Sequence, residues 1–139
     1  MKIAFVQNFL LDSTGSANAG YLYPHLGLIS LMAEIENSRH VSFLYDPMLQ
    51  LHKGCLSLDS SIYNDVAEQL LESEPDAIGF TALGCNFVAV VKIARCIKES
   101  RPETLILLGG PHATVLESPI MTKFTDFASR YRYIDIFLF

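Results

Sequence analysis

The sequence predicts an α/β fold, a doubly wound and mainly parallel sheet of five strands. Five short apolar runs rich in β-branched or aromatic residues recur along the 139 residues, and amphipathic segments separate them. The runs do not alternate between apolar and polar residues, which is typical of parallel strands covered on both faces. Strand, helix and strand repeat about every 30 to 35 residues, and right-handed crossovers then produce an open sheet.

The expected strands are the five apolar runs, residues 2–7, 41–45, 77–81, 104–108 and 133–139. We expect them to take the flavodoxin-like order 2-1-3-4-5. In such a sheet, ligands lie beyond the carboxyl ends of the strands, where the strand order reverses. Candidate functional positions at or just after the strand ends are therefore Asn8, Asp46, Thr81 and Gly109.

The segments between the runs have helical periodicity. Residues 26–37 carry apolar side chains at 28, 31, 32 and 35, and residues 62–72 carry them at 62, 66 and 70. Residues 86–100 form the clearest amphipathic segment, which Asn86 could cap and which Pro102 ends. A fourth helix is expected to start near His112 or Ala113, and Pro119 is expected to interrupt or restart it.

Composition indicates one ordered domain. Half of the residues are apolar, 18% are charged and the mean hydropathy is +0.30, which excludes intrinsic disorder. The net charge of −5, without a basic cluster, argues against a nucleic-acid partner. The spacing of Cys55, Cys85 and Cys96 fits neither a disulfide framework nor a metal knuckle, so we expect reduced thiols in the core.

The two ends of the sequence carry further expectations. The first apolar run is too short for a signal peptide or a membrane span, so we expect a cytoplasmic protein with no membrane partner. The last run, residues 133–139, is a strand with no helix after it to cover its outer face. We therefore expect residues 1–139 to be one domain, a truncated N-terminal module of a larger protein or a domain whose last strand meets a neighbour or a second copy.

Two strand ends carry candidate binding residues. Gly109-Gly110-Pro111-His112 follows the fourth strand, and the glycine pair either lets a ligand approach the backbone or forms a tight turn. His112 either meets that ligand or caps the turn. At the end of the third strand, Thr81 either donates to a ligand or bonds to nearby backbone.

Several catalytic motifs are absent. The sequence has no Gly-x-Gly-x-x-Gly, no Gly-x-x-x-x-Gly-Lys-Ser/Thr and no Gly-x-Ser-x-Gly. The four histidines at 25, 40, 52 and 112 share no metal-ligand spacing, and His40 is expected at a strand entrance. We therefore predict no metal site built from side chains and no catalysis by this chain alone.

A family resemblance rests on four segments taken in order. They are Pro24-His25-Leu26-Gly27-Leu28, Ile78-Gly79-Phe80-Thr81, Ile97-Lys98 before Pro102, and Leu108-Gly109-Gly110-Pro111-His112-Ala113-Thr114. Together they resemble the N-terminal cobalamin-binding domain of B12-dependent radical SAM enzymes, over nearly the whole chain. The resemblance implies a domain that holds cobalamin for methyl transfer. It also implies that S-adenosylmethionine and an iron–sulfur cluster bind to a following radical SAM domain, the partner of this one.

Two departures from related patterns refine this expectation. The Asp-x-His-x-x-Gly motif, by which methionine synthase-like domains place a histidine on cobalt, is absent, so we expect cobalamin to bind in a His-off state. The Cys-x-x-x-Cys-x-x-Cys cluster motif is absent as well, so this chain performs no radical step by itself. Family positions imply cofactor contacts at Asn8, Pro24, Thr81, Leu83, Gly109, Gly110, Pro111 and His112.

Two other functions stay open on the sequence alone. The hydroxyl-rich residues 13–18 suggest a flavodoxin-like FMN electron carrier, although residues 9–12 separate that loop from the first strand. A degenerate domain could instead keep the fold as a docking surface and bind no cofactor. A response-regulator receiver is excluded, because Gln7 and Asn8 replace its acidic pair and Thr81 replaces its phosphoacceptor aspartate.

Overall fold

The computed structural model describes residues 1–9, 25–122, 129 and 131–139. Its elements are β1 (Lys2–Val6), α1 (Leu26–Glu36), β2 (Val41–Tyr45), α2 (Pro47–His52), α3 (Ile62–Glu72), β3 (Ala77–Thr81), α4 (Phe87–Ser100), β4 (Leu105–Gly109), α5 (Pro111–Thr122) and β5 (Ile136–Phe137). The strands form one sheet in the order β2-β1-β3-β4-β5, and each neighbouring pair is parallel. The predicted fold class and strand order are confirmed.

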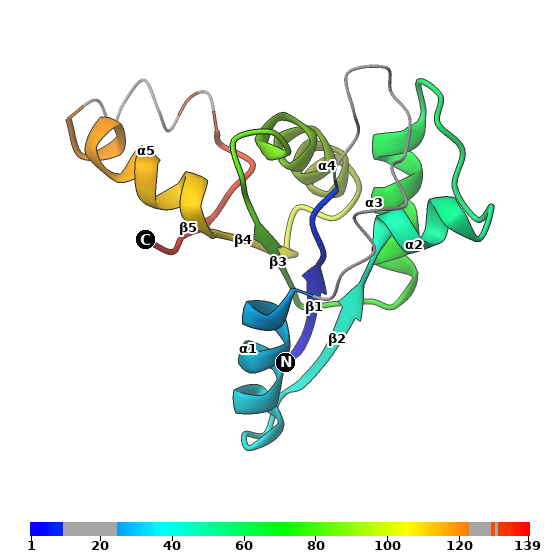
Figure 1. Ribbon diagram of the computed structural model, residues 1–139, viewed down its shortest axis with the longest axis horizontal. Helices are drawn as coiled ribbons and strands as arrows, with labels where there is room; N and C mark the ends of the chain where they lie inside the picture. The colour runs from blue at the N-terminus through cyan, green and yellow to red at the C-terminus, as the bar shows by residue number, and fades with distance from the viewer. Residues whose placement is uncertain (10–24, 123–128, 130) are drawn as a thin grey trace.

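The helices divide unequally between the two faces of the sheet. Figure 1 shows α1 on one face and α3 and α4 on the other. The core lies between the sheet and α3 and α4, where alternate strand residues meet the apolar stripes of both helices. Its members include Ala4, Val6, Val66, Leu70, Ile78, Phe80, Ile93, Ile97, Ile106 and Leu108. None of the helices in the described part of the chain has the length and apolar character to cross a membrane.

The α1 face of the sheet is covered only in part. All five residues of β3 are buried, as expected for a strand covered on both faces. The same expectation is wrong for β4 and β5, because Leu105 is 38% exposed and Ile136 is 41% exposed. Their apolar side chains on this face line an open groove, which gives the same continuous apolar pattern in the sequence as a buried strand.

The boundaries of β2, β3 and α3 match the prediction, and α4 begins immediately after its N-cap residue Asn86. Helix α2 was not predicted. The sequence nevertheless carries a signal for its start, because Pro47 follows the N-cap residue Asp46. In the structure, the carboxylate of Asp46 accepts from the backbone N–H of Leu49 at 3.0 Å. An acidic N-cap followed by proline is a typical helix start.

Helix α5 runs from Pro111 to Thr122 without a break, so the predicted interruption at Pro119 is wrong. Proline removes the hydrogen bond that residue 119 would donate to the carbonyl of Val115. Val115 is exposed, so water can replace that donor. Pro111 opens the helix, where a missing N–H has no cost.

Strand β5 is shorter than the predicted 133–139. Backbone bonds from Asp135 N–H to the Ile106 carbonyl (3.0 Å) and from Leu138 N–H to the Leu108 carbonyl (2.8 Å) flank it. The carboxylate of Asp135 also accepts from the Ile106 N–H at 2.7 Å and pairs with Lys98 at 2.7 Å. A side chain here takes the place of a backbone acceptor, which ends the regular ladder at this point.

The three cysteines are free, but the expectation that they lie in the core is wrong for Cys55 and Cys85, which are exposed. Cys96 is partly buried and packs against the core. Cys55 follows α2 in a turn, and Cys85 lies in the loop before α4. Both therefore fall in connections and not in the apolar runs that pack together.

Candidate functional site

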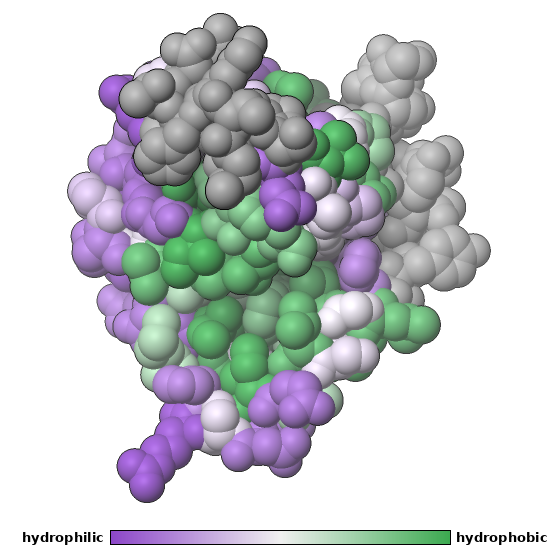
Figure 2. Space-filling model, turned by 90° about the vertical axis from the view of Figure 1, so that its left-hand side faces the viewer, coloured by the Kyte–Doolittle hydropathy of each residue, from purple (hydrophilic) through white to green (hydrophobic). Residues whose placement is uncertain are grey.

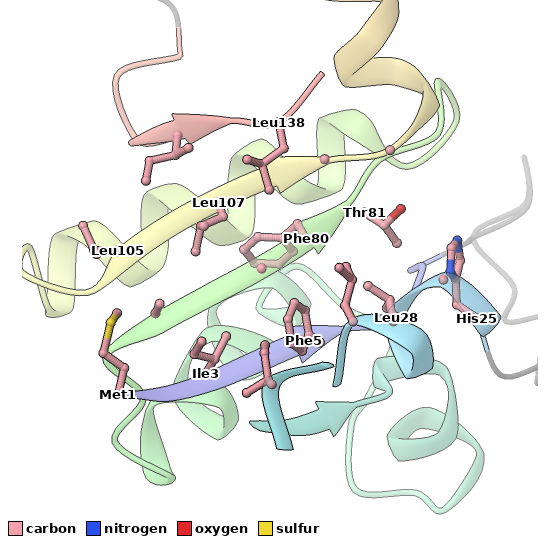
Figure 3. Close-up of a pocket in the computed structure, with 18 residues that line it drawn as sticks. Met1, Ile3, Phe5, His25, Leu28, Phe80, Thr81, Leu105, Leu107 and Leu138 are labelled. Atoms are coloured by element: carbon pink, nitrogen blue, oxygen red, sulfur yellow. The ribbon is translucent and has the colours of Figure 1, made fainter. Parts of the chain in front are cut away.

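A groove of about 540 Å³ lies on the α1 face of the sheet. Figure 2 shows that apolar side chains gather in a hollow on this side of the molecule. The lining residues come from α1 and from strands β1, β3, β4 and β5, as Figure 3 shows. They are Met1, Ile3, Phe5, His25, Gly27, Leu28, Leu31, Ile35, Ala77, Gly79, Phe80, Thr81, Leu105, Leu107, Gly109, Gly110, Ile136 and Leu138. Size and apolar lining are those of a small-molecule site.

Small residues on β3 and β4 leave space above the sheet and so deepen the groove. Ala77 and Gly79 are alternate positions of β3, and Gly109 ends β4. A Cβ atom at Gly79 would lie 3.0 Å from the ring of Phe5, a tighter contact than most Cβ atoms make. The glycine therefore gives the Phe5 ring its place beside β3.

The polar side chains of the groove gather at its carboxyl end. Figure 3 shows Thr81 and His25 at one end, and Met1 and Leu105 at the other. Because Thr81 pairs in register with Gly109, the ends of β3 and β4 are level here. The groove thus opens at the edge of the sheet where this topology places ligands.

The loop between β3 and α4 is held by Asn86, which is 1% exposed. Its side-chain oxygen accepts from the backbone N–H of Leu83 at 2.8 Å. Its side-chain nitrogen donates to Oδ1 of Asn8 at 3.1 Å and to the Thr81 carbonyl at 3.2 Å. Asn86 occupies the predicted N-cap position but makes no capping bond to the helix; it joins the ends of β1 and β3.

The two glycines after the β4 run have different surroundings. Gly110 has φ +95°, and a Cβ there would lie 2.7 Å from Oγ1 of Thr81 and 3.0 Å from backbone atoms of Ala82. A Cβ at Gly109 would meet Leu138 at an ordinary 3.6 Å. Gly110 is therefore required by the close packing of two loops and by its backbone conformation. Both glycines also line the groove.

The predicted site residues form two groups. Thr81, Gly109 and Gly110 line the groove, whereas Asn8, Leu83, Pro111 and His112 do not. The His112 ring packs on Phe87, with 4.4 Å between centroids, and its backbone N–H donates to the Ala82 carbonyl at 2.9 Å. Pro24 lies outside the described residues, as does the loop 13–18.

Sequence reasoning missed His25 as a site residue. It lines the groove, and its Nδ1 atom is buried without a hydrogen-bond partner in the described part of the chain. The signal was its position: it directly precedes α1, on the segment Pro24–Leu28 that carries part of the family resemblance. A lone histidine with no metal spacing gave no reason to select it.

One buried hydroxyl group near the strand ends lies outside the groove. Burial raises the pKa of Tyr45, at the end of β2, and its hydroxyl donates to Oε1 of Gln69 at 2.7 Å. The residue is thus a neutral hydrogen-bond donor outside the groove. Within the described residues, no cluster of three His, Cys, Asp or Glu side chains could hold a metal ion.

Comparison with known proteins supplies the family. The family model described as B12 binding domain matches residues 13–131, most of the chain. The chain is also similar to 2-(S-pantetheinyl)-carbapenam-3-carboxylate methyltransferase from Streptantibioticus cattleyicolor, with 34% identity over 64 residues. That alignment covers 46% of this chain and 8% of the relative's length. On the family match, together with the parallel 2-1-3-4-5 sheet, the chain belongs to the B12-binding domain family.

Proposed function

We propose that this chain binds cobalamin at the carboxyl edge of its sheet and serves as the cofactor module of a methyltransferase. The observation that carries the proposal is the groove of about 540 Å³ that opens at this edge, between α1 and β4, in a member of the B12-binding family. Bound cobalamin would supply a cobalt-borne methyl group, and the chain would hold and orient it.

The groove suits the nucleotide tail of the cofactor. This tail ends in a flat, apolar dimethylbenzimidazole base, which a ribose and a phosphate connect to the corrin. An apolar groove with a polar mouth matches that order of groups. We place the base along Leu107 and Leu28, and the tail beside Gly109 and Gly110.

The other predicted residues surround the edge above the groove. Asn8 and Leu83 belong to the network of Asn86, and Pro111 and His112 begin α5. We propose that these residues contact the corrin, with its lower face against the loop after β1. The bonds of Asn86 to Asn8 and Leu83 position two of these residues before the ligand arrives, which would lower the entropic cost of binding.

We further propose that no histidine of this chain coordinates cobalt. The Asp-x-His-x-x-Gly motif is absent from the sequence. The contact of His112 with the Phe87 ring gives its imidazole a packing role at the start of α5. A variant test separates the two possibilities: His112→Ala should leave the absorbance spectrum of the bound corrinoid unchanged, and a changed cobalt spectrum would identify His112 as an axial ligand.

The catalytic partner belongs to this proposal as well. The similar methyltransferase is far longer than the matched segment, which is 8% of its length. We propose a parent protein in which a radical SAM domain follows this one and carries S-adenosylmethionine and the iron–sulfur cluster. Reading the gene beyond the codon for residue 139 tests this, because the cluster motif Cys-x-x-x-Cys-x-x-Cys should follow; an uninterrupted reading frame without it would refute the radical SAM part.

Reconstitution tests cofactor binding itself. The purified chain is incubated with hydroxocobalamin or with FMN, desalted, and its absorbance spectrum recorded. We expect a corrinoid spectrum that elutes with the protein and no retained flavin. Retained flavin alone would favour the electron carrier, and a colourless protein in both cases would favour a docking domain without cofactor.

A further inference from the structure

The groove has a marked division between apolar and polar lining. Among its lining residues in the described chain, only His25 and Thr81 have polar side chains. Both lie at the carboxyl end (Figure 3), and every other side chain that lines the groove is apolar. A ligand that enters with an apolar group therefore meets hydrogen-bonding atoms at one place only.

His25 places a ring nitrogen, Nδ1, at the carboxyl end of the groove. Its Nδ1 is buried and has no hydrogen-bond partner among the residues that the structure describes. A buried polar atom without a partner is unfavourable, and such atoms are rare in folded proteins. The atom is suited to a ligand that brings the missing partner into the groove.

The position of the imidazole is built into the fold. The backbone N–H of His25 donates to Oε1 of Gln7 at 3.1 Å, which ties the residue to the end of β1. Its carbonyl accepts from the N–H groups of Leu28 and Ile29 at 2.9 and 3.2 Å, which starts α1. A Cβ at Gly27 would lie 3.2 Å from the ring, so the glycine leaves the ring its space.

We propose that His25 is a specificity-determining residue of the groove, whose Nδ1–H donates to an oxygen of the ribose–phosphate link in the nucleotide tail of cobalamin. This inference rests on the proposed function and specifies the part of the ligand to which His25 binds. The N-terminus of α1 favours negative charge at the same point, which suits a phosphodiester. Once bound, the link provides a partner for an atom that has none among the described residues.

The test compares two corrinoids, of which only one carries the nucleotide tail. Hydroxocobalamin carries the nucleotide, and cobinamide has the corrin without it. Dissociation constants are measured by absorbance titration for wild type, His25→Phe and His25→Asn. Phenylalanine keeps the ring and removes both nitrogens, whereas the asparagine amide retains a donor near the position of Nδ1. The matched control is His52→Phe, an exposed histidine at the end of α2.

We expect His25→Phe to bind hydroxocobalamin about tenfold more weakly than wild type, because it loses one hydrogen bond to a charged group. The same variant should bind cobinamide as wild type does. His25→Asn should recover most of the affinity, and His52→Phe should change neither constant. If His25 had only a structural role, His25→Phe would lower the melting temperature. We expect no decrease in melting temperature, because His25→Phe removes an unsatisfied buried atom.

Unchanged hydroxocobalamin affinity in His25→Phe, or an equal loss for both corrinoids, would overturn the inference and leave cobalamin binding intact. If His25→Phe does not fold, His25→Ala replaces it in the same comparison, and His25→Asn remains the variant expected to recover the affinity. Wild-type protein that binds neither corrinoid would instead refute the proposed function, and the inference with it.

Discussion

At the scale of single residues, the two glycines after β4 predict opposite results for the same small substitution. Gly110→Ala should lower the free energy of unfolding by about 2 kcal/mol or more, because φ +95° is strained for alanine and its Cβ would collide with Thr81. Gly109→Ala should stay within about 1 kcal/mol of wild type, since its Cβ meets Leu138 at an ordinary distance. Denaturant unfolding measures both.

The difference between Gly109 and Gly110 also determines which substitution is useful in a cobalamin-binding experiment. A bulky residue at Gly110 would abolish cobalamin binding by displacing Thr81 and Ala82, whether or not the tail lies there. Gly109→Ala is the informative variant, because it narrows the groove in a protein that stays folded. Equal stability of the two alanine variants would contradict the packing described for Gly110.

The thiols predict an ordered labelling reaction. Cys55 and Cys85 are exposed, whereas burial raises the pKa of Cys96 and lowers its thiolate fraction near neutral pH. An aromatic disulfide reagent should therefore modify two thiols quickly and the third more slowly, with the rate at Cys96 rising toward higher pH. Mass spectrometry of the partly labelled protein identifies the slow site, and Cys96 among the fast ones would be inconsistent with the structure.

At the scale of elements, β5 depends on one carboxylate. Asp135→Ala removes the acceptor of the Ile106 N–H and the partner of Lys98, whose side chain is largely buried. We expect a loss of about 1 to 3 kcal/mol and faster hydrogen exchange at the amides of Ile106 and Leu138. Glu99→Ala is the control, because its pair with Arg95 is exposed and contributes little. Matching effects of the two substitutions would remove Asp135 from this role.

The elements also show which parts of the fold the sequence predicts. The runs of β2 and β3 and the periodicity of α3 are local signals, so their boundaries match. Strand β5 ends early because Asp135 bonds to Ile106, which lies far away in the sequence. Helix α2 has a local signal at Asp46 and Pro47 that apolar periodicity overlooks, because its six residues are too few for a repeating stripe.

The site is less predictable than the fold for a related reason. Thr81, Gly109 and Gly110 were found because topology alone brings strand ends together. His25 depends on where α1 starts relative to β1, through the bond to Gln7, and on a space left by Gly27. Such a position follows from packing between elements and cannot be predicted from the spacing of residues along the sequence.

At the scale of the whole molecule, the β5 edge, beyond which no further strand pairs among the described residues, predicts self-association of the isolated chain. Strand β5 is the last strand of the sheet, and Leu138 and Phe139 beside it are 51% and 53% exposed. We propose that a second copy pairs along this edge, since an open apolar strand edge is a template for association. Sedimentation velocity should show a dimer that increases with concentration.

A charged edge provides the control for this prediction. Leu138→Lys adds like charges on both copies at the proposed contact and should return the protein to monomers. A wild-type chain that stays monomeric at high concentration, or a dimer that Leu138→Lys does not weaken, would rule out pairing through β5.

We expect cobalamin to bind across the carboxyl edge with its nucleotide tail in the groove on the α1 face. A crystal structure of the chain with hydroxocobalamin tests it most directly. We expect the dimethylbenzimidazole base between α1 and β4, the ribose–phosphate link within hydrogen-bonding distance of His25, and no histidine on cobalt. A corrinoid bound elsewhere with the groove empty, or a histidine of this chain on cobalt, would contradict it.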